Sequence, residues 1–350
     1  MNFASDNAGP AHPKVLESLA RANDGYAMPY GNDPLTARAE EKVRELFETP
    51  DAAVFLVATG TAANSLCLAT LSQPWDTVFC ARFAHAHVDE CNSPEFFSGG
   101  IKITTVGGAD DKFNASELEV AIGTWDPANI QNPAHGPVSI TQVTERGTLY
   151  SLPEIDAISR VAKLHGLALH LDGARFANAV VALGCNAAEM SWRAGVDAVS
   201  FGGTKNGLMG VEAAVIFDGD LAEEFARRRK RGAHLFSKSR YLAAQMDAYL
   251  TDDLWRETAT AANAAATRLA AGLESVDGAE FAFKPSANMI YVWMPRAMHR
   301  RLTEAGANYY IEQGKLEGDD PSELLLGRLV CDWSTSEDSV DRLLEIAGGN

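Results

Sequence analysis

Short apolar runs alternate with helix-compatible segments over most of this 350-residue chain. Clear runs lie at residues 52–58, at residues 167–171, where only His170 is polar, and at residues 196–201. Runs of this length between helices are typical of buried parallel strands, because helices cover both faces of a parallel sheet. The pattern therefore predicts an α/β fold with a mostly parallel sheet.

Two helices can be placed from their first residues. Asp33 before Pro34 is typical of an N-cap followed by a proline in the first turn. Ser151 and Glu154 have the spacing of a capping box, and Gly166 is expected to end that helix just before an apolar run. A helix that leads directly into a buried strand agrees with the alternating pattern.

The pattern changes after about residue 245. Residues 257–275 form an alanine-rich helical segment, and residues 280–295 contain two alternating apolar runs. Such a mixture favours a smaller α+β unit. We therefore expect a large domain over residues 1–245, including the N-terminal segment, and a small C-terminal domain over residues 246–350.

The charge balance limits the possible partners. The chain has 47 acidic and 30 basic side chains and a formal net charge of −17, which opposes binding to nucleic acid or to an anionic membrane. The basic run at residues 227–231 is interpreted as a solvated helix face, because Glu223 and Glu224 stand four residues ahead of Arg227 and Arg228. A small-molecule substrate and other protein chains remain as partners.

The cysteines and the apolar segments bear on the compartment. Five cysteines are scattered without a CxxC pair, which is not a disulfide framework. No segment reaches the roughly 18 unbroken apolar residues of a membrane helix, and residues 1–13 lack the pattern of a signal peptide. These features, with 46% hydrophobic residues for a full core, predict a cytoplasmic globular protein.

Three separate segments place reactive groups directly after predicted strands. Gly60 follows the first apolar run and opens a helix, while Asp172 and Lys205 follow the second and third runs. Each segment alone is more simply explained as an ordinary turn, a helix N-cap or a solvated lysine. Together they are informative, because ligands of open α/β sheets bind at the carboxyl ends of the strands.

Pyridoxal phosphate is a ligand that needs this combination. Its phosphate binds at a helix N-terminus, a carboxylate keeps its pyridine nitrogen protonated, and a lysine forms a Schiff base with its aldehyde. The segment between Asp172 and Lys205 is long enough for a crossover helix between parallel strands, which needs about a dozen residues or more. We therefore predict that the three segments form one pyridoxal phosphate site.

The order and residues of several short motifs resemble those of low-specificity L-threonine aldolases, and the resemblance extends over almost the whole chain. The motifs are FASDN at 3–7, YGNDP at 30–34, GTAAN at 60–64, HAHVDE at 85–90, DGAR at 172–175 and GGTKNG at 202–207. The resemblance implies a pyridoxal-phosphate-dependent transferase fold of type I, similar to aspartate aminotransferase, with a mostly parallel sheet in the large domain.

The resemblance also implies roles for individual residues. Lys205 is expected to form the Schiff base, Asp172 to pair with the pyridinium nitrogen, and His85 to stack over the cofactor ring. The residues expected to bind the cofactor are Gly60, Thr61, Asn64, His85, Asp172, Arg175, Thr204 and Lys205, with Lys238 or Arg240 from a neighbouring subunit. Those expected to bind the substrate are Ser5, Tyr30, His87, Arg175 and Arg328. Arginine suits a substrate carboxylate because its planar guanidinium donates two parallel hydrogen bonds.

The catalytic base is left open among three groups. His85 is one candidate, because an imidazole titrates near the working pH, and His87 or a water held by Glu145 are the others. Many relatives have a histidine in a Thr-His-x-Gly segment where residues 144–147 here read Thr-Glu-Arg-Gly. On a strand, His85 and His87 would face the same side, and with Asp89 and Glu90 close by a metal would be conceivable. No third ligand has zinc-like spacing, so no metal is expected.

By resemblance, the activity is that of an aldehyde-lyase that cleaves L-threonine and L-allo-threonine to glycine and an aldehyde, in a homotetramer of dimers with each site at a dimer interface. A phenylserine-preferring aldolase is an alternative, as is β-elimination, transamination or racemisation on the same cofactor, which supports all of these reactions. A non-catalytic binding protein would lack Lys205, Asp172 or Arg175, and a dinucleotide-dependent dehydrogenase would carry a GxGxxG motif.

Overall fold

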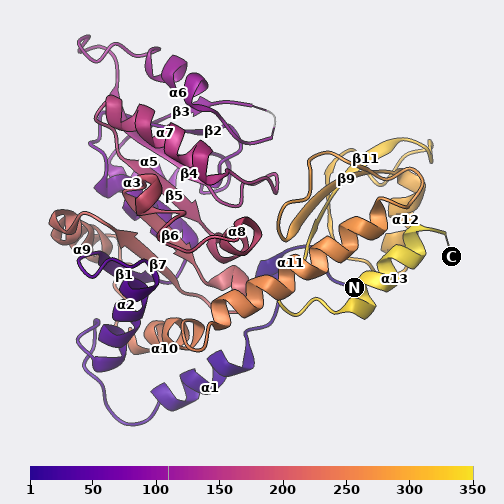
Figure 1. Cartoon of the computed structure of the whole chain (residues 1–350), viewed down its shortest axis with the longest axis horizontal. Helices are drawn as coiled ribbons and strands as arrows, with labels where there is room; N and C mark the ends of the chain where they lie inside the picture. Colours follow the sequence, from indigo (N-terminus) through magenta and orange to yellow (C-terminus); the bar gives the residue numbers. More distant parts are fainter. Residues whose placement is uncertain (109, 350) are drawn as a thin grey trace.

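The computed structural model describes residues 1–108 and 110–349 and contains two β-sheets (Figure 1). The larger sheet has seven strands in the order β1-β7-β6-β5-β4-β2-β3. Its strands are β1 (Ala53–Val57), β2 (Asp76–Ala81), β3 (Lys102–Val106), β4 (Ala134–Thr141), β5 (Leu169–Gly173), β6 (Ala198–Gly202) and β7 (Glu212–Ile216). Strands β2 to β6 pair in parallel, whereas β7 is antiparallel to β1 and β6. The predicted α/β fold with a mostly parallel sheet is confirmed.

Helices cover both faces of this sheet. On β7, Ala213 and Val215 pack into one apolar core, while Ala214 and Ile216 pack into a second core on the other face. The first core includes side chains of α2 (Pro34–Leu46), α7 (Leu152–Leu164), α8 (Phe176–Leu183) and α10 (Arg240–Tyr249), and the second includes α3 (Gly60–Thr70) and α9 (Ala222–Arg231). The other helices before β5 are α1 (Pro13–Ala22), α4 (His85–Val88), α5 (Ser93–Ser98) and α6 (Ala115–Ile122). All residues of β5 and β6 are buried, as expected for strands covered on both faces.

The helix starts expected from capping residues are present. The Asp33 carboxylate accepts the backbone N–H of Thr36 at 2.9 Å, and α2 begins with the next residue after Asp33. The backbone N–H of Ser151 donates to the Glu154 carboxylate at 2.7 Å at the start of α7. Carboxylates in the first turn also interact favourably with the helix dipole. In the part of the chain that the structure describes, no helix combines the length and apolar content needed to cross a bilayer.

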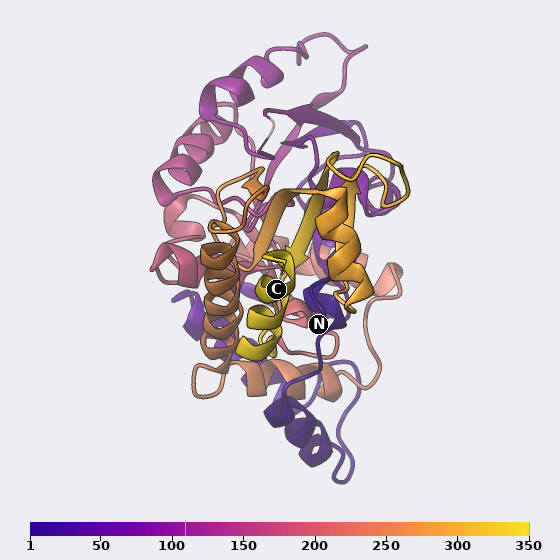
Figure 2. The same cartoon turned by 90° about the vertical axis from the view of Figure 1, so that its right-hand side faces the viewer.

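The second sheet has four antiparallel strands in the order β10-β11-β9-β8 and has its own apolar core. Its strands are β8 (Glu280–Phe281), β9 (Met289–Pro295), β10 (Tyr310–Gln313) and β11 (Leu324–Val330), and it packs with α12 (Arg296–Glu304) and α13 (Glu337–Ala347) (Figure 2). Helix α11 (Leu254–Leu273) extends from one unit to the other: Trp255 packs in the core of the large sheet and Leu269 in the core of the second sheet. The domain boundary expected near residue 245 stays a prediction.

The N-terminal segment runs from the second sheet to the large sheet. Phe3 is buried in the second core, its N–H donates to the carbonyl of Asn308 at 2.7 Å, and its carbonyl accepts the N–H of Val330 at 2.8 Å. The short 3-10 helix η1 (Asp6–Ala8) follows and brings Asp6 into contact with Arg175, just beyond β5. The segment therefore lies between the two units, beside the carboxyl ends of the central strands.

Candidate active site

A cavity of about 410 Å³ lies where β5 and β6 end and where α3 begins. The residues that line it are Asn7, Ala58, Thr59, Gly60, Thr61, Asn64, His85, Asp172, Ala174, Thr204, Lys205, Met209, Gly210 and Glu212. Gly60, Asp172 and Lys205, which are far apart in the sequence, thus share one cavity. Most residues expected to bind the cofactor are among these lining residues.

The first turn of α3 presents backbone N–H groups to this cavity. Thr59 caps the helix, with its Oγ1 accepting the N–H of Ala62 at 3.1 Å. Gly60 and Thr61 lie in the first turn, where backbone N–H groups have no acceptor within the helix. Together with the positive end of the helix dipole, this turn is suited to hold a phosphate group.

Asp172 is a buried carboxylate at the end of β5, with 3% of its surface exposed. Its Oδ2 accepts a hydrogen bond from Asn64 Nδ2 at 2.9 Å, and its Oδ1 accepts the backbone N–H of Ala174 at 3.0 Å. The Oδ1 of Asn64 is itself buried and has no hydrogen-bond partner among the described residues. The carboxylate is therefore held in one orientation at the wall of the cavity.

Lys205 lies in the 3-10 turn η3 (Thr204–Asn206), which directly follows β6. The side chain of Asn206 anchors this turn, because its Nδ2 donates to the hydroxyl of Tyr249 at 2.6 Å and to the carbonyl of Trp255 at 2.8 Å. Gly207 ends the turn with a φ of 99°, which residues with side chains rarely adopt. These contacts hold the backbone of the turn in place while Lys205 lines the cavity.

A buried hydrogen-bonded chain connects His85 with Asp172. His85 Nδ1 lies 2.9 Å from Glu90 Oε1, and the same oxygen accepts a hydrogen bond from Asn64 Nδ2 at 2.9 Å. The hydrogen bond to Glu90 raises the pKa of His85, although partial burial acts against this shift. With Nδ1 engaged, Nε2 is the ring nitrogen left for a ligand. From the sequence, Glu90 was weighed only as a neighbour of a metal site that was not expected, and its hydrogen bond with His85 was not predicted.

Arg175 is paired with a carboxylate of the N-terminal segment. Its Nε and Nη2 donate to the two oxygens of Asp6 at 2.7 and 3.0 Å, and Asn288 Nδ2 donates to Asp6 at 3.0 Å. Burial alone would raise the pKa of Asp6, but the charges of Arg175 and Lys205 and these hydrogen bonds lower it below its ordinary value. Asp6 was not among the predicted site residues, although it stands in the FASDN motif. A guanidinium has five N–H donors, so two-point pairing with Asp6 leaves donors for a second anion.

Arg328 lies on β11 with part of its guanidinium unpaired. Its Nη2 donates to the carbonyl of Ala4 at 3.2 Å, and its Nη1 lies 3.5 Å from a carboxylate oxygen of Glu312. Its Nε is buried without a hydrogen-bond partner in the described part of the chain. Ser5 caps η1, because its Oγ accepts the N–H of Asn7 at 3.1 Å. The N-terminal segment thus contacts both arginines that were expected to bind the substrate.

His87 does not line the cavity. It is exposed, and its Nδ1 lies 2.9 Å from the carbonyl oxygen of Arg82. His85 and His87 belong to the short helix α4 rather than to a strand, and residues two apart on a helix do not face the same side. The expectation that both rings share one side is therefore wrong. Among the described residues, no group of three or more His, Cys, Asp or Glu side chains is placed to hold a metal ion.

Glu145 lies near the cavity without lining it. Its N–H donates to Asp111 at 3.2 Å, and its carbonyl accepts the hydroxyl of Tyr291 at 2.7 Å. The hydrogen bond to Glu90 is the main cause that raises the pKa of His85, and the negative charge of Glu145 adds a smaller contribution in the same direction. The segment is thus close enough to act electrostatically on the site.

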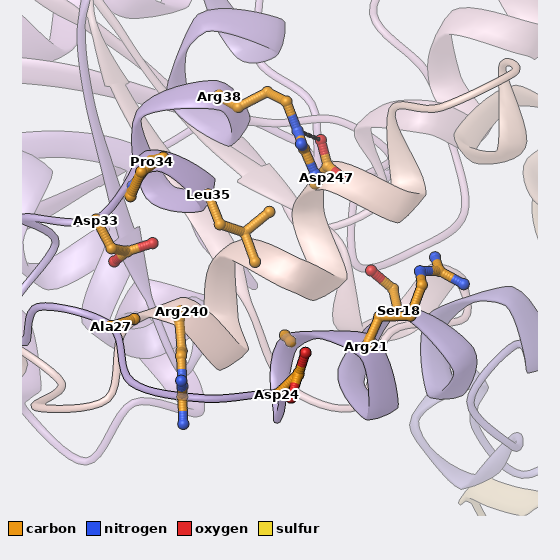
Figure 3. A pocket seen from close by; sticks show the side chains of 11 residues that line it. Ser18, Arg21, Asp24, Ala27, Asp33, Pro34, Leu35, Arg38, Arg240 and Asp247 are labelled. Atoms are coloured by element: carbon orange, nitrogen blue, oxygen red, sulfur yellow. Dashed lines mark hydrogen bonds and ion pairs between the residues drawn. The ribbon is translucent and has the colours of Figure 1, made fainter.

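The predicted residues Ser5, Arg175 and Arg328 do not line the cavity either, and Tyr30, Lys238 and Arg240 also lie outside it. Tyr30 is partly exposed and has a φ of 61°. Lys238 is exposed before α10, and Arg240 lines a separate hollow of about 440 Å³ between α1, α2 and α10, where Arg38 pairs with Asp247 (Figure 3). A contact between Lys238 or Arg240 and a cofactor would therefore require a site on a neighbouring subunit.

Glu212 is a second buried carboxyl group beside the turn of Lys205. It begins β7 opposite Gly202, its Oε2 accepts the N–H of Gly203 at 2.6 Å, and its Oε1 accepts the hydroxyl of Thr204 at 2.5 Å. Burial raises the pKa of Glu212 to about 7, although these hydrogen bonds and the charge of Lys205 act in the opposite direction. Glu212 was not predicted as a site residue. Its position as the only acidic residue within the apolar run at residues 211–217 is the sequence feature that could have indicated a buried carboxyl group.

Comparison with known proteins gives consistent matches over most of the chain. A family model described as beta-eliminating lyase matches residues 2–295. The chain is 42% identical over 346 residues to the low specificity L-threonine aldolase of Pseudomonas aeruginosa, covering 99% of this chain and 95% of that protein. It is 40% identical over 342 residues to the low specificity L-threonine aldolase of a Pseudomonas species, covering 97% of this chain and 95% of that protein.

Solved structures agree with these matches. The threonine aldolase of Leishmania major superposes with a TM-score of 0.91 at 28% identity and covers 99% of this chain and 98% of its own. Aspartate aminotransferase from Thermus thermophilus, at 17% identity, shares the fold with a TM-score of 0.70 over 99% of this chain and 91% of its own. These likenesses confirm the predicted type I fold. The chain therefore belongs to the low-specificity L-threonine aldolase family, within the beta-eliminating lyases.

Proposed function

We propose that this protein is a pyridoxal-phosphate-dependent aldolase that cleaves L-threonine, L-allo-threonine and related β-hydroxy-α-amino acids to glycine and an aldehyde. One observation carries the proposal: a single cavity combines the N-terminus of α3, the buried carboxylate of Asp172 and the amine of Lys205. The family membership gives the substrate class, since the relatives described above are named threonine aldolases.

The residues of the cavity fit the cofactor. Gly60 and Thr61 would hold the phosphate at the first turn of α3, Asp172 would pair with the ring nitrogen, and Lys205 would bind the aldehyde carbon. The buried, unpartnered Oδ1 of Asn64 is a free acceptor at the same place. When bound, the cofactor supplies an electron-accepting ring that takes up the electrons of the broken Cα–Cβ bond.

The chain's own residues prepare that chemistry. Asn64 and the N–H of Ala174 hold Asp172 as an oriented anion, so it favours a protonated ring nitrogen. Arg328, through its unpartnered Nε, and Arg175, through donors that Asp6 leaves free, would bind the substrate carboxylate together with Ser5. Holding the substrate carboxylate would fix the orientation of the bonds at Cα and so decide which of them is broken.

The proposed base for the substrate hydroxyl is His85. It lines the cavity, and Glu90 holds its Nδ1, which leaves Nε2 to accept a proton. His87, which is exposed, and a water held by Glu145 are the alternatives. The position of His85 favours it over both, because neither His87 nor Glu145 lines the cavity.

Assembly and location are proposed on the same basis. We propose a homotetramer of dimers in the cytoplasm, in which Lys238 or Arg240 reaches the cofactor phosphate of a neighbouring subunit, and a large domain over residues 1–245 with a small one over 246–350. The exposure of Lys238 supports this arrangement. Sedimentation velocity of the purified protein tests the assembly, and a monomer at micromolar concentration would contradict it.

A chemical test of the site uses the lysine. The purified protein with cofactor is expected to be yellow, and borohydride should attach the chromophore irreversibly to the peptide that contains Lys205. Lys205→Ala should abolish turnover and prevent this attachment, because no other amine is expected to form the Schiff base. Lys14→Ala, in an exposed lysine of α1, is the matched control. A protein that stays colourless when the cofactor is added would reject the proposal.

The reaction is tested by products. Threonine, allo-threonine, phenylserine and serine are incubated with the enzyme, and glycine and aldehyde are quantified. Equal amounts of glycine and acetaldehyde from threonine support the aldolase. Ammonia with a 2-oxo acid would indicate β-elimination, an amino-group transfer would indicate transamination, loss of optical activity would indicate racemisation, and a strong preference for phenylserine would select that variant.

A further inference from the structure

Glu212 lines the same cavity as the proposed phosphate site. Glu212, Thr204 and Lys205 line the cavity together with Gly60 and Thr61 of the α3 turn. A space of about 410 Å³ is about as wide as one Debye length, roughly 8 Å at physiological ionic strength. Because Glu212 is buried, its repulsion of an anion in this space would be weakly screened.

The other charged groups around Glu212 do not remove the repulsion between its carboxylate and a phosphate in the cavity. Lys205 faces it from η3 and lowers its pKa, while Tyr249 faces it from α10 as a buried neutral hydroxyl. Across the cavity stand Asp172 on β5, an anion, and His85 on α4. An ionised Glu212, an ionised Asp172 and a phosphate would thus share one small space with a single lysine.

The hydrogen bonds of Glu212 can rearrange if its carboxylate becomes protonated. The hydroxyl of Thr204 has one proton, which it donates to Oε1 of Glu212, so it has none for another acceptor. A protonated Glu212 can instead donate to the oxygen of Thr204, while its other oxygen keeps the N–H of Gly203. The hydroxyl proton of Thr204 is then free for an anion in the cavity.

We propose that Glu212 takes up a proton from solvent when the phosphate group of the cofactor enters the cavity, and that its hydrogen bond with Thr204 then reverses so that the hydroxyl donates to the anion. Only one O–H bond forms, at the Glu212 carboxylate, and the positive charge gained offsets part of the incoming negative charge. Glu212 is thus a positioning residue that acts through Thr204. The inference rests on the proposed cofactor.

The test measures protons rather than turnover. Protein stripped of cofactor is titrated calorimetrically with pyridoxal phosphate in two buffers of different ionisation enthalpy, for the wild type and for Glu212→Gln. Glutamine keeps an acceptor for Gly203 and a donor for Thr204 but has no proton to gain. At about pH 8, where Glu212 is mostly ionised without ligand, the wild type should take up close to one proton more than the variant. At about pH 6, where Glu212 is already protonated, the difference should vanish.

Two further measurements keep the outcome decisive. If Glu212→Gln does not fold, the wild type is titrated at about pH 8 with pyridoxal, which lacks the phosphate. With pyridoxal, the protein should take up about one proton fewer than with pyridoxal phosphate. The phosphate itself is already ionised at that pH, because its second pKa is near 6. Thr204→Val should weaken binding of pyridoxal phosphate at least severalfold, whereas Thr204→Ser should bind like the wild type.

Each outcome has a meaning. Equal proton uptake by wild type and Glu212→Gln at both pH values, or by the wild type with both ligands, overturns the inference and leaves the proposed function intact. Unchanged binding by Thr204→Val overturns the reversal of the hydrogen bond. If the wild type and Glu212→Gln both fail to bind pyridoxal phosphate, the proposed function fails instead.

Discussion

Three residues of the site, His85, Asp172 and Arg175, each have a buried carboxyl or amide as their partner. Glu90 holds His85, Asn64 holds Asp172, and Asp6 holds Arg175. Such a partner fixes the orientation of a reactive group and also sets its charge. Changes at these partners should therefore alter pH dependence and substrate affinity without removing the reactive groups themselves.

Glu90→Gln should shift the pH dependence of the reaction. The hydrogen bond to Glu90 raises the pKa of His85, so losing the carboxylate lowers that pKa toward its ordinary value. If unprotonated His85 is the base, the acid limb of the kcat/KM profile moves to lower pH, and kcat falls by about tenfold because the ring is less well held. Asp89→Asn, at the exposed neighbour, is the control. An acid limb that does not move would exclude His85 as the titrating base.

Asp6→Ala should destabilise the fold and weaken substrate binding. It leaves the buried guanidinium of Arg175 without its carboxylate, which costs about 3–5 kcal/mol of unfolding free energy. Because a freed Arg175 can rotate, KM for threonine should rise more than kcat falls. Urea denaturation and steady-state kinetics measure both effects. Asp341→Ala, which breaks an exposed pair with Arg268, should change neither; an Asp6→Ala protein with wild-type stability would show that the pair contributes little.

At the level of strands and helices, much could be predicted from the sequence. The apolar runs that predicted strands correspond to β1, β5 and β6, because a buried parallel strand needs apolar residues on both faces. The antiparallel direction of β7 could not be predicted, since a short apolar run is equally compatible with either direction of pairing. Helix α4 could not be predicted from a four-residue segment, and so the two histidines were placed wrongly.

The same limit applies within the site. Gly60, Asp172 and Lys205 could be predicted because each follows a strand and therefore reaches the same edge of the sheet. Glu90, Asp6 and Glu212 were missed, because their roles depend on contacts with Asn64, Arg175 and Gly203 that only the fold brings together. Glu90 and Asp6 do stand in the motifs at 85–90 and 3–7, but a motif does not say which side chain its acidic residue contacts.

His170 makes strand β5 sensitive to acid. Its ring lies between the hydroxyls of Ser139 and Ser200, at 2.9 and 3.0 Å, and burial lowers the pKa of His170 to about 4. The folded state keeps the ring neutral while the unfolded chain binds a proton below its ordinary pKa of 6.5, so stability present above pH 6.5 is lost as the pH falls toward 4, by up to about 3 kcal/mol.

Urea denaturation between pH 7 and pH 5 measures this loss. His170→Asn should start less stable but lose less stability over the interval, whereas His165→Asn, in a partly exposed histidine, should lose as much as the wild type. Parallel pH dependences of the wild type and His170→Asn would show that His170 is not the source.

At the scale of the whole molecule, the N-terminal segment couples the second sheet to the active site. Phe3 is fully buried in the second core, while Asp6, three residues later, pairs with Arg175 beside β5. Ala4 lies between them and accepts a hydrogen bond from Arg328 on β11. Loss of the segment's own anchor in the second core should therefore reach the substrate-binding arginines, whereas a cavity elsewhere in that core should not.

Phe3→Ala tests that coupling. Removal of a buried phenylalanine should cost about 3–5 kcal/mol of unfolding free energy, and the loosened segment should raise KM for threonine at least severalfold. Leu302→Ala, in the same core but on α12, should lose about 2–5 kcal/mol and leave KM unchanged. Equal KM values for the two variants would show that the segment does not transmit the disturbance.

Helix α11 is continuous, and its buried side chains pack into the core of the large sheet at its start and into the second core towards its end. A residue inserted or deleted near its middle would turn everything beyond that point by about 100° around the helix axis and shift it by about 1.5 Å. The second core would then present the wrong side chains to its sheet, and Arg328 would be carried away from its neighbours. Insertions and deletions among homologues should accordingly be confined to the loops on either side of α11, because the length of this helix sets the spacing between the two sheets.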